Sequence, residues 1–232
     1  MVMISELQAI WDGFDFTYIF EIFTGVTAAL LCICLHELSH GLVAYKLGDD
    51  TARQRGRLTL NPIKHLDLMG LLMMLVFHVG WAKPVPVNPN YFKNPKRGMA
   101  LVALAGPVMN LFICVLGLLL YGMLLYPLSG SAVGKYVLDF LILMSSMSVG
   151  LAVFNLLPLP PLDGSKVLFS FIPDEWYYKL MHYERYGSII IFVLFATGAV
   201  NKPVSAAVDA VFSMLVYFAQ LGLDIVMKLF VL

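Results

Sequence analysis

The sequence predicts an all-α polytopic membrane protein with about five to six transmembrane helices and a small re-entrant β element at the cytoplasmic interface. Of its 232 residues, 60% are apolar, and the mean hydropathy is +0.83. Charged residues make up 13%, about half of the ~25% usual in soluble domains. The net charge is zero. This composition excludes a soluble globular enzyme, a disordered chain and a nucleic-acid binder, which needs a basic excess.

The first apolar run covers residues 16–47 and is expected to be a helix of about 46 Å, longer than the bilayer core of ~30 Å. The segment before it has no early Lys or Arg and no small-residue cleavage site. We therefore expect the run to stay in the mature protein as a span. The following segment carries Arg53, Arg55 and Arg57 at every second position, a period that predicts a short strand over residues 53–60.

Residues 66–80 form an apolar segment that is too short for an ordinary span, which favours a re-entrant path. The proline-rich segment that follows is expected to be extended and to pair with the strand before it. Pro84 and Pro86 remove N–H donors from one edge, whereas Val85 and Val87 keep theirs on the other. That second edge could hold an unwound substrate by β-addition, or the prolines could only protect the sheet from aggregation. Both interpretations stay open.

The remaining apolar runs are assigned as spans, and the whole chain, 1–232, as one domain with a catalytic core over 16–172 and accessory helices over 181–232. If the segment 66–80 does not cross, 13 of the 15 basic residues lie on one side. The positive-inside rule then puts the N-terminus outside and the basic loops and the C-terminus in the cytoplasm. The expected spans after the first are 98–126, 136–157, 181–200 and 204–223.

The strongest chemical signal is the sequence His36-Glu37-Leu38-Ser39-His40. On a helix, His36 and His40 lie one turn apart on one face, so that both imidazoles can reach one tetrahedral Zn²⁺. Glu37 stands beside them, where it can take a proton from the attacking water. Ionisable side chains inside an apolar run are costly and generally functional. The alternative is a pair of histidines that only hydrogen-bond inside a helix bundle.

A catalytic zinc usually has three protein ligands, so a third residue must come from elsewhere. Cys32 shares the helix face but lies eight residues from His40, about 12 Å along the axis, which favours a packing role. Asp163 is the better candidate. It follows a proline-rich helix exit at the end of the span 136–157, and the next residue, Gly164, permits a tight turn.

With these motifs the chain resembles the site-2 protease family of intramembrane zinc metalloproteases. The resemblance rests on HELSH, on NLLPLPPLDG at 155–164, and on the intervening GWAKPVPVNP and ALAGPVMN segments. It implies one Zn²⁺ per chain held by His36, His40 and Asp163, with Glu37 as the general base. It also implies that Asn155 holds substrate or polarises the reacting carbonyl. The implied partners are the lipid bilayer and a transmembrane protein substrate, cut near the cytoplasmic face.

Secondary roles are predicted for two further residues. His65 could orient a ligand, or it could be a solvated interfacial histidine. Asn110 could hydrogen-bond near the site, although its helix segment, with Gly106 and Pro107, could equally be a packing kink. Two other functions stay open: a divalent-metal transporter and a protease-like scaffold without turnover. The sequence names neither the substrate nor the oligomeric state.

Overall fold

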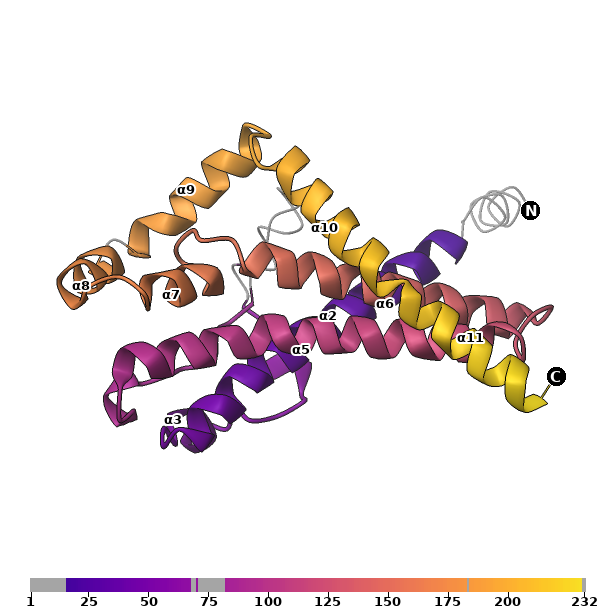
Figure 1. The fold of residues 1–232 in the computed structure, drawn as a ribbon, viewed down its shortest axis with the longest axis horizontal. Helices are drawn as coiled ribbons and strands as arrows, with labels where there is room; N and C mark the ends of the chain where they lie inside the picture. The colour runs from indigo at the N-terminus through magenta and orange to yellow at the C-terminus, as the bar shows by residue number, and fades with distance from the viewer. Residues whose placement is uncertain (1–15, 68–69, 71–81, 183, 231–232) are drawn as a thin grey trace, which may run out of the picture.

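The computed structural model describes residues 16–67, 70, 82–182 and 184–230, and they are mostly helical (Figure 1). Within these described ranges, four helical segments are long and apolar enough to cross a membrane. The protein is therefore a multi-pass membrane protein. The spans are α2 (Phe16–Lys46), α5 (Pro95–Leu125), α6 (Ala132–Asn155) and the consecutive pair α10 (Asn201–Leu215) and α11 (Tyr217–Phe230).

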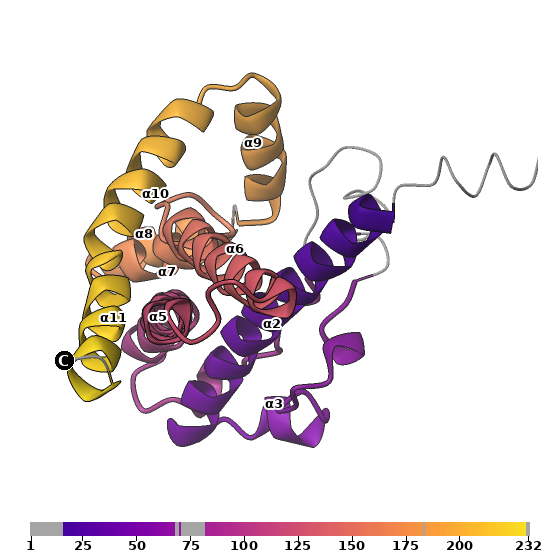
Figure 2. The same ribbon diagram turned by 90° about the vertical axis from the view of Figure 1, so that its right-hand side faces the viewer.

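Helix α5 is the centre of the bundle and packs against α2, α6 and α11 (Figures 1 and 2). Its glycines make this close packing possible. A Cβ on Gly117 would overlap the Ser145 hydroxyl of α6, and one on Gly122 would overlap the Ala219 carbonyl of α11. Small residues let helix backbones approach closely where no hydrophobic effect drives helices together in lipid. The sequence of α5 therefore determines how near its neighbours lie.

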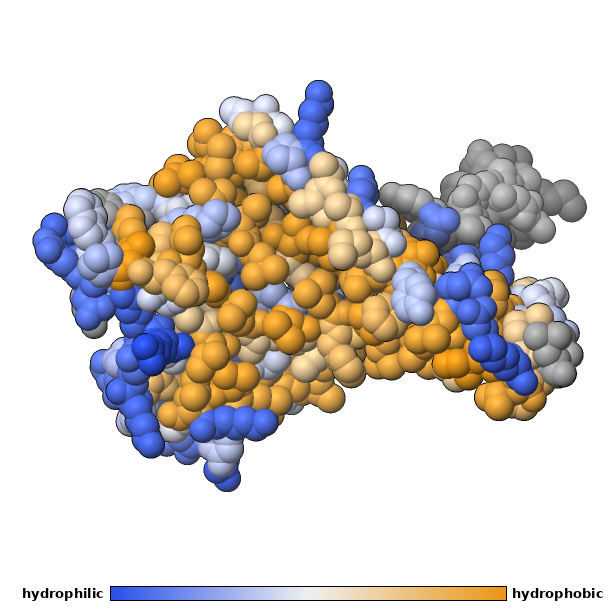
Figure 3. All heavy atoms as spheres, in the orientation of Figure 1, coloured by the Kyte–Doolittle hydropathy of each residue, from blue (hydrophilic) through white to orange (hydrophobic). Residues whose placement is uncertain are grey.

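The polar residues gather where the connecting elements lie. Figure 3 shows an apolar band over the middle of the bundle and hydrophilic side chains concentrated at the end that carries α3 and α8. Many large apolar side chains are exposed, among them Phe23 and Phe112, as expected for a surface that faces lipid. The connecting elements are α3 (Thr51–Gln54), η1 (Pro62–Lys64), η2 (Pro89–Tyr91), α7 (Asp163–Phe169), α8 (Asp174–His182) and α9 (Glu184–Ala196).

The predicted strand over residues 53–60 is wrong. Its first part belongs to the short helix α3, because the Asp49 carboxylate accepts the backbone N–H of Thr51 at 3.0 Å and favours a turn there. In the described part of the chain, the expected small sheet is reduced to one antiparallel bridge between Leu66 and Ala82. Most of the segment 66–80 lies outside the described residues, so its re-entrant path remains a prediction.

The C-terminal region also differs from the prediction. Helix α9 has only 13 residues, and the two separate crossings expected over 181–200 and 204–223 are not confirmed. The end of α11 lies beside the end of α5, where Tyr126 and Phe230 line one shallow hollow. That end of the molecule is opposite the start of α5 and the basic loops (Figure 1). The prediction put the end of the chain on the same side as the basic loops, whereas the end of α11 lies at the other end of the bundle from them (Figure 1).

Candidate metal centre

Three of the predicted residues meet in one cluster. His36 and His40 project from α2, and Asp163 is the first residue of α7. The Nε2 atom of each histidine lies 3.2 Å from Oδ2 of Asp163, and the three ligand atoms lie within 4.8 Å of one another. Tetrahedral zinc with bonds of about 2.0–2.2 Å places its ligand atoms about 3.3–3.6 Å apart. The two distances to Asp163 are close to this range, so the three residues fit the ligand set of a zinc ion.

The cluster is largely removed from solvent, and the two histidines face the carboxylate. His36 and His40 are buried, and the Asp163 side chain is 13% exposed. Burial acts to raise the pKa of the Asp163 carboxyl, but hydrogen bonds and charge from both histidines outweigh it and hold the pKa well below its usual range. Asp163 therefore remains a carboxylate, the form that binds a metal ion.

The chain path after α6 brings Asp163 to the histidines. Helix α6 ends at Asn155, and the proline-rich segment that follows turns into α7. Gly164 is buried in this turn, and a Cβ there would overlap the carbonyl oxygen of Leu156. Only glycine lets the start of α7 fold so closely onto the end of α6. This contact returns the Asp163 carboxylate to α2.

Helix α5 contacts both imidazole rings at their Nδ1 atoms. Nδ1 of His40 lies 2.7 Å from the Val102 carbonyl oxygen, and Nδ1 of His36 lies 3.1 Å from the Asn110 side-chain amide. Both rings therefore turn Nε2 towards Asp163. Gly106 lies between these contacts, and a Cβ there would lie 2.5 Å from Nε2 of each histidine. The backbone of α5 thus closes one side of the cluster.

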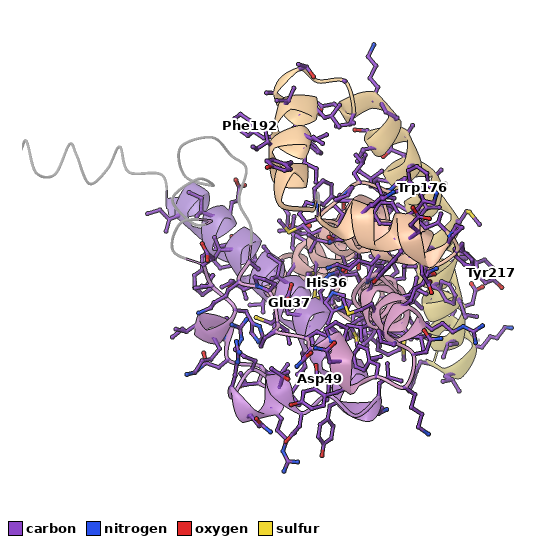
Figure 4. All side chains as sticks on the ribbon, turned by 90° about the vertical axis from the view of Figure 1, so that its left-hand side faces the viewer. His36, Glu37, Asp49, Trp176, Phe192 and Tyr217 are labelled. Carbon is purple, nitrogen blue, oxygen red and sulfur yellow. The ribbon has the colours of Figure 1, made fainter. Side chains whose placement is uncertain are left out.

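Glu37 lies beside the cluster (Figure 4) and is held by a second contact. Its Oε2 accepts the backbone N–H of Val85 at 2.8 Å. The extended segment that contains Val85 is itself fixed at two points. The buried Arg57 guanidinium donates to the Lys83 carbonyl at 2.7 Å, and the Asp49 carboxylate accepts the Asn88 N–H at 2.6 Å. The orientation of Glu37 therefore depends on residues far from it in sequence.

The other predicted residues make hydrogen bonds or packing contacts outside the ligand cluster. Asn155 is half-buried, and its amide donates to the Leu151 carbonyl of its own helix at 3.0 Å, so its contact with substrate remains a prediction. His65 is buried rather than solvated, and its Nε2 lies 2.8 Å from the Thr59 carbonyl oxygen. Val87 packs against a small apolar cluster of Ala44, Phe92 and Val102.

Sequence reasoning missed two groups that shape this site. The Val102 carbonyl orients His40, but a backbone atom leaves no signature in residue type. Asp49 is fully buried and joins the end of α2 to Asn88. An aspartate directly after a glycine at the end of a long helix was the available signal for it, because such residues often bond nearby backbone N–H groups.

Several known proteins are similar to this chain in sequence. The model of peptidase family M50 matches residues 122–201, a range that contains Asn155 and Asp163 but not the two histidines. The "Putative zinc metalloprotease YwhC" of Bacillus subtilis is 45% identical over 174 residues, 74% of this chain and 80% of that protein.

Two mycobacterial proteins match at lower identity. "Putative zinc metalloprotease Rip2" of Mycolicibacterium smegmatis is 34% identical over 75% of this chain and 66% of that protein. Its namesake in Mycobacterium tuberculosis is 32% identical over 74% of this chain and 66% of that protein. No solved structure matches at a significant level. The matches to the family model and to these relatives show that the chain belongs to peptidase family M50, the site-2 protease family.

Proposed function

We propose that this protein is an intramembrane zinc metalloprotease that hydrolyses a peptide bond in or near a transmembrane segment of its substrate. The observation that carries the proposal is the cluster of His36, His40 and Asp163, with Glu37 next to the first ligand. Two nitrogen ligands and one oxygen ligand leave a fourth tetrahedral position open, which is the usual arrangement of a catalytic zinc site. The names of three relatives as zinc metalloproteases support the same metal and reaction.

The proposed mechanism assigns one role to each residue. Zinc held by the three ligands supplies Lewis acidity, which makes water acidic and polarises a carbonyl group. Glu37 takes the proton from the attacking water and later gives it to the leaving amine. In the structure, its Oε2 accepts the Val85 N–H at 2.8 Å, and this bond keeps the carboxylate beside the ligands. The Asn155 amide gives up its hydrogen bond to the Leu151 carbonyl and then donates to the carbonyl oxygen of the substrate.

The segment 82–88 is the proposed place where an unwound substrate lies. Hydrolysis requires an exposed peptide bond, because a helix hides its carbonyl groups in hydrogen bonds. Val85 was predicted to offer its N–H at a sheet edge, but in the structure Glu37 accepts that N–H. We therefore propose that substrate and Glu37 compete for this donor. Arg57 keeps the segment in place through the Lys83 carbonyl.

We also propose that α2 begins outside the cell and that cleavage occurs near the cytoplasmic face. The Lys83 N–H donates to the His65 carbonyl at 2.9 Å, next to the bridge between Leu66 and Ala82. Residues 65–66 and residues 82–83 therefore lie side by side. This supports the proposal that the segment between them does not cross the membrane. When α10 and α11 form one span that ends outside, Lys228 moves outside and Lys202, at the start of α10, moves to the proposed cytoplasmic side, so that 13 of the 15 basic residues lie there.

The two other functions are less well supported. A divalent-metal transporter needs further ligand groups along a path, and in the described ranges the only cluster of three or more candidate ligands is His36, His40 and Asp163. A scaffold without turnover has no need of Glu37, which the Val85 contact keeps beside the ligands.

Glu37→Gln tests the proposed reaction, because glutamine has the same reach but cannot accept a proton as a base. The parent and the variant are reconstituted with tagged single-span membrane peptides, and cleavage and zinc content are measured. We expect the variant to keep its zinc and to cut about 10²–10⁴-fold more slowly. Glu21→Gln, on the same helix, serves as a matched control and should cut like the parent. Cleavage by Glu37→Gln within a few-fold of the parent would refute the mechanism.

A further inference from the structure

The Asn110 side chain is a fully buried polar group in contact with a metal ligand. It is fully buried on α5, and its Nδ2 lies 3.1 Å from Nδ1 of His36. Its other end, Oδ1, is also buried, and within the described part of the chain it has no hydrogen-bond partner. A buried carbonyl oxygen without a partner is destabilising, because it has lost its hydrogen bonds to water. The amide therefore has a hydrogen-bond partner at its nitrogen end and none at its oxygen end.

The tautomer of His36 determines which end of the Asn110 amide should face the His36 imidazole. A neutral imidazole carries one N–H, and a ring that binds a metal through Nε2 must carry its proton on Nδ1. In that state Nδ1 is a donor, and it cannot pair with the Nδ2 amide group, which is also a donor. A half-turn of the Asn110 amide replaces Nδ2 with Oδ1 at the ring. O and N of such an amide have nearly the same shape, so the exchange needs no space.

The same exchange does not occur at His40. Its Nδ1 faces the Val102 carbonyl oxygen at 2.7 Å, and a carbonyl can only accept. His40 therefore carries a proton on Nδ1 with or without the metal, and its Nε2, 3.2 Å from Asp163, is the atom that binds the metal. Of the two histidines, only His36 relies on a side chain that both donates and accepts.

We propose that Asn110 is a positioning residue that fixes the tautomer of His36 by turning its amide when the metal binds. With the metal present, Oδ1 accepts the Nδ1–H of His36. Without it, Nδ2 donates to Nδ1, and the Nε2–H of His36 donates to Asp163, at the 3.2 Å contact seen in the structure. The backbone position of Asn110 is fixed independently, because Ser148 of α6 donates to its carbonyl oxygen at 2.8 Å.

This inference rests on the metal site of the proposed function but not on peptide cleavage. Groups of this kind typically change metal affinity by 10–100-fold when they are removed. Asn110→Leu keeps the approximate volume and removes both hydrogen-bonding ends. Asn110→Asp keeps an acceptor at the same reach and removes the donor. The two variants therefore separate the acceptor role from simple packing between α5 and α2.

The experiment measures zinc affinity by competition with a chelator in detergent-purified protein, together with the thermal unfolding of the zinc-free protein. We expect zinc affinity about 10–100-fold below the parent for Asn110→Leu and within about threefold of it for Asn110→Asp. The zinc-free Asn110→Asp protein should unfold at a lower temperature than the parent and regain more stability from zinc. Ser145→Ala, which removes a buried hydroxyl that donates to the Leu141 carbonyl of its own helix, is the control and should bind zinc like the parent.

Two results would overturn the inference. One is parent-like zinc affinity in Asn110→Leu, and the other is a folded Asn110→Asp protein that loses zinc affinity by tenfold or more. If Asn110→Leu fails to fold, the zinc affinity of Asn110→Asp tests the inference by itself. A parent that binds zinc but cuts no peptide would overturn the proposed protease function and leave this inference intact. A parent that binds no zinc would overturn both.

Discussion

Gly106→Ala should disable the metal centre by adding a single methyl group. A Cβ at this position would lie 2.5 Å from Nε2 of both His36 and His40, whereas non-bonded heavy atoms prefer about 3.5–4.0 Å. The two rings must therefore move by about 1 Å. Zinc sites keep their ligand distances within about 0.2 Å, so the required movement is about five times that tolerance. We expect zinc affinity to fall by at least about 100-fold.

The assay for this variant is again chelator competition, with thermal unfolding of the zinc-free protein as the test of folding. Alanine is better than glycine in a helix interior by about 1 kcal/mol, so a loss of zinc would not follow from weaker helix formation. Gly150→Ala is the matched control, because a Cβ there meets nothing within 4 Å. Parent-like zinc affinity in a folded Gly106→Ala protein would refute the argument that the α5 backbone closes the site.

Two other predictions follow from the same geometry. Asp163→Ala should lower zinc occupancy in purified protein as much as His36→Ala, since each removes one of three ligands, and full retention of zinc would exclude Asp163 as a ligand. Single cysteines at Asn94, Ser129 and Lys228 in a cysteine-free background test the topology with a membrane-impermeant reagent. The last two should react from outside and Asn94 only from the cytoplasm, and reaction of Asn94 and Lys228 from the same side would contradict the path seen for α11.

Sequence reasoning was most successful where the signal is local. An apolar run long enough to cross a bilayer predicts a span without any knowledge of its neighbours, and α2, α5 and α6 lie where such runs occur. Two histidines four residues apart share a helix face in any helix. The local rule failed at Arg53–Arg57, where a period of two suggested a strand. There, the Asp49 carboxylate stabilises a helical turn instead.

Contacts between distant segments could not be predicted in the same way. The C-terminal apolar runs contain enough residues for two crossings, but α11 packs along α5 because Gly122 and Gly222 let the two backbones meet. That packing determines on which side the chain ends. The sequence supplied the hydrophobicity of these segments, but their direction is a property of the packed bundle.

By itself, the sequence determined the membrane class, the long first helix and a pair of histidines with a neighbouring acid. Asp163 could be chosen as the third ligand from its motif and from the resemblance, but only the folded chain brings its carboxylate to 3.2 Å from both rings. The supporting contacts to His36 and His40 come from α5, more than 60 residues away. Ligand identity is encoded in residue type, whereas ligand orientation depends on hydrogen bonds and close backbone contacts that exist only once the helices have packed.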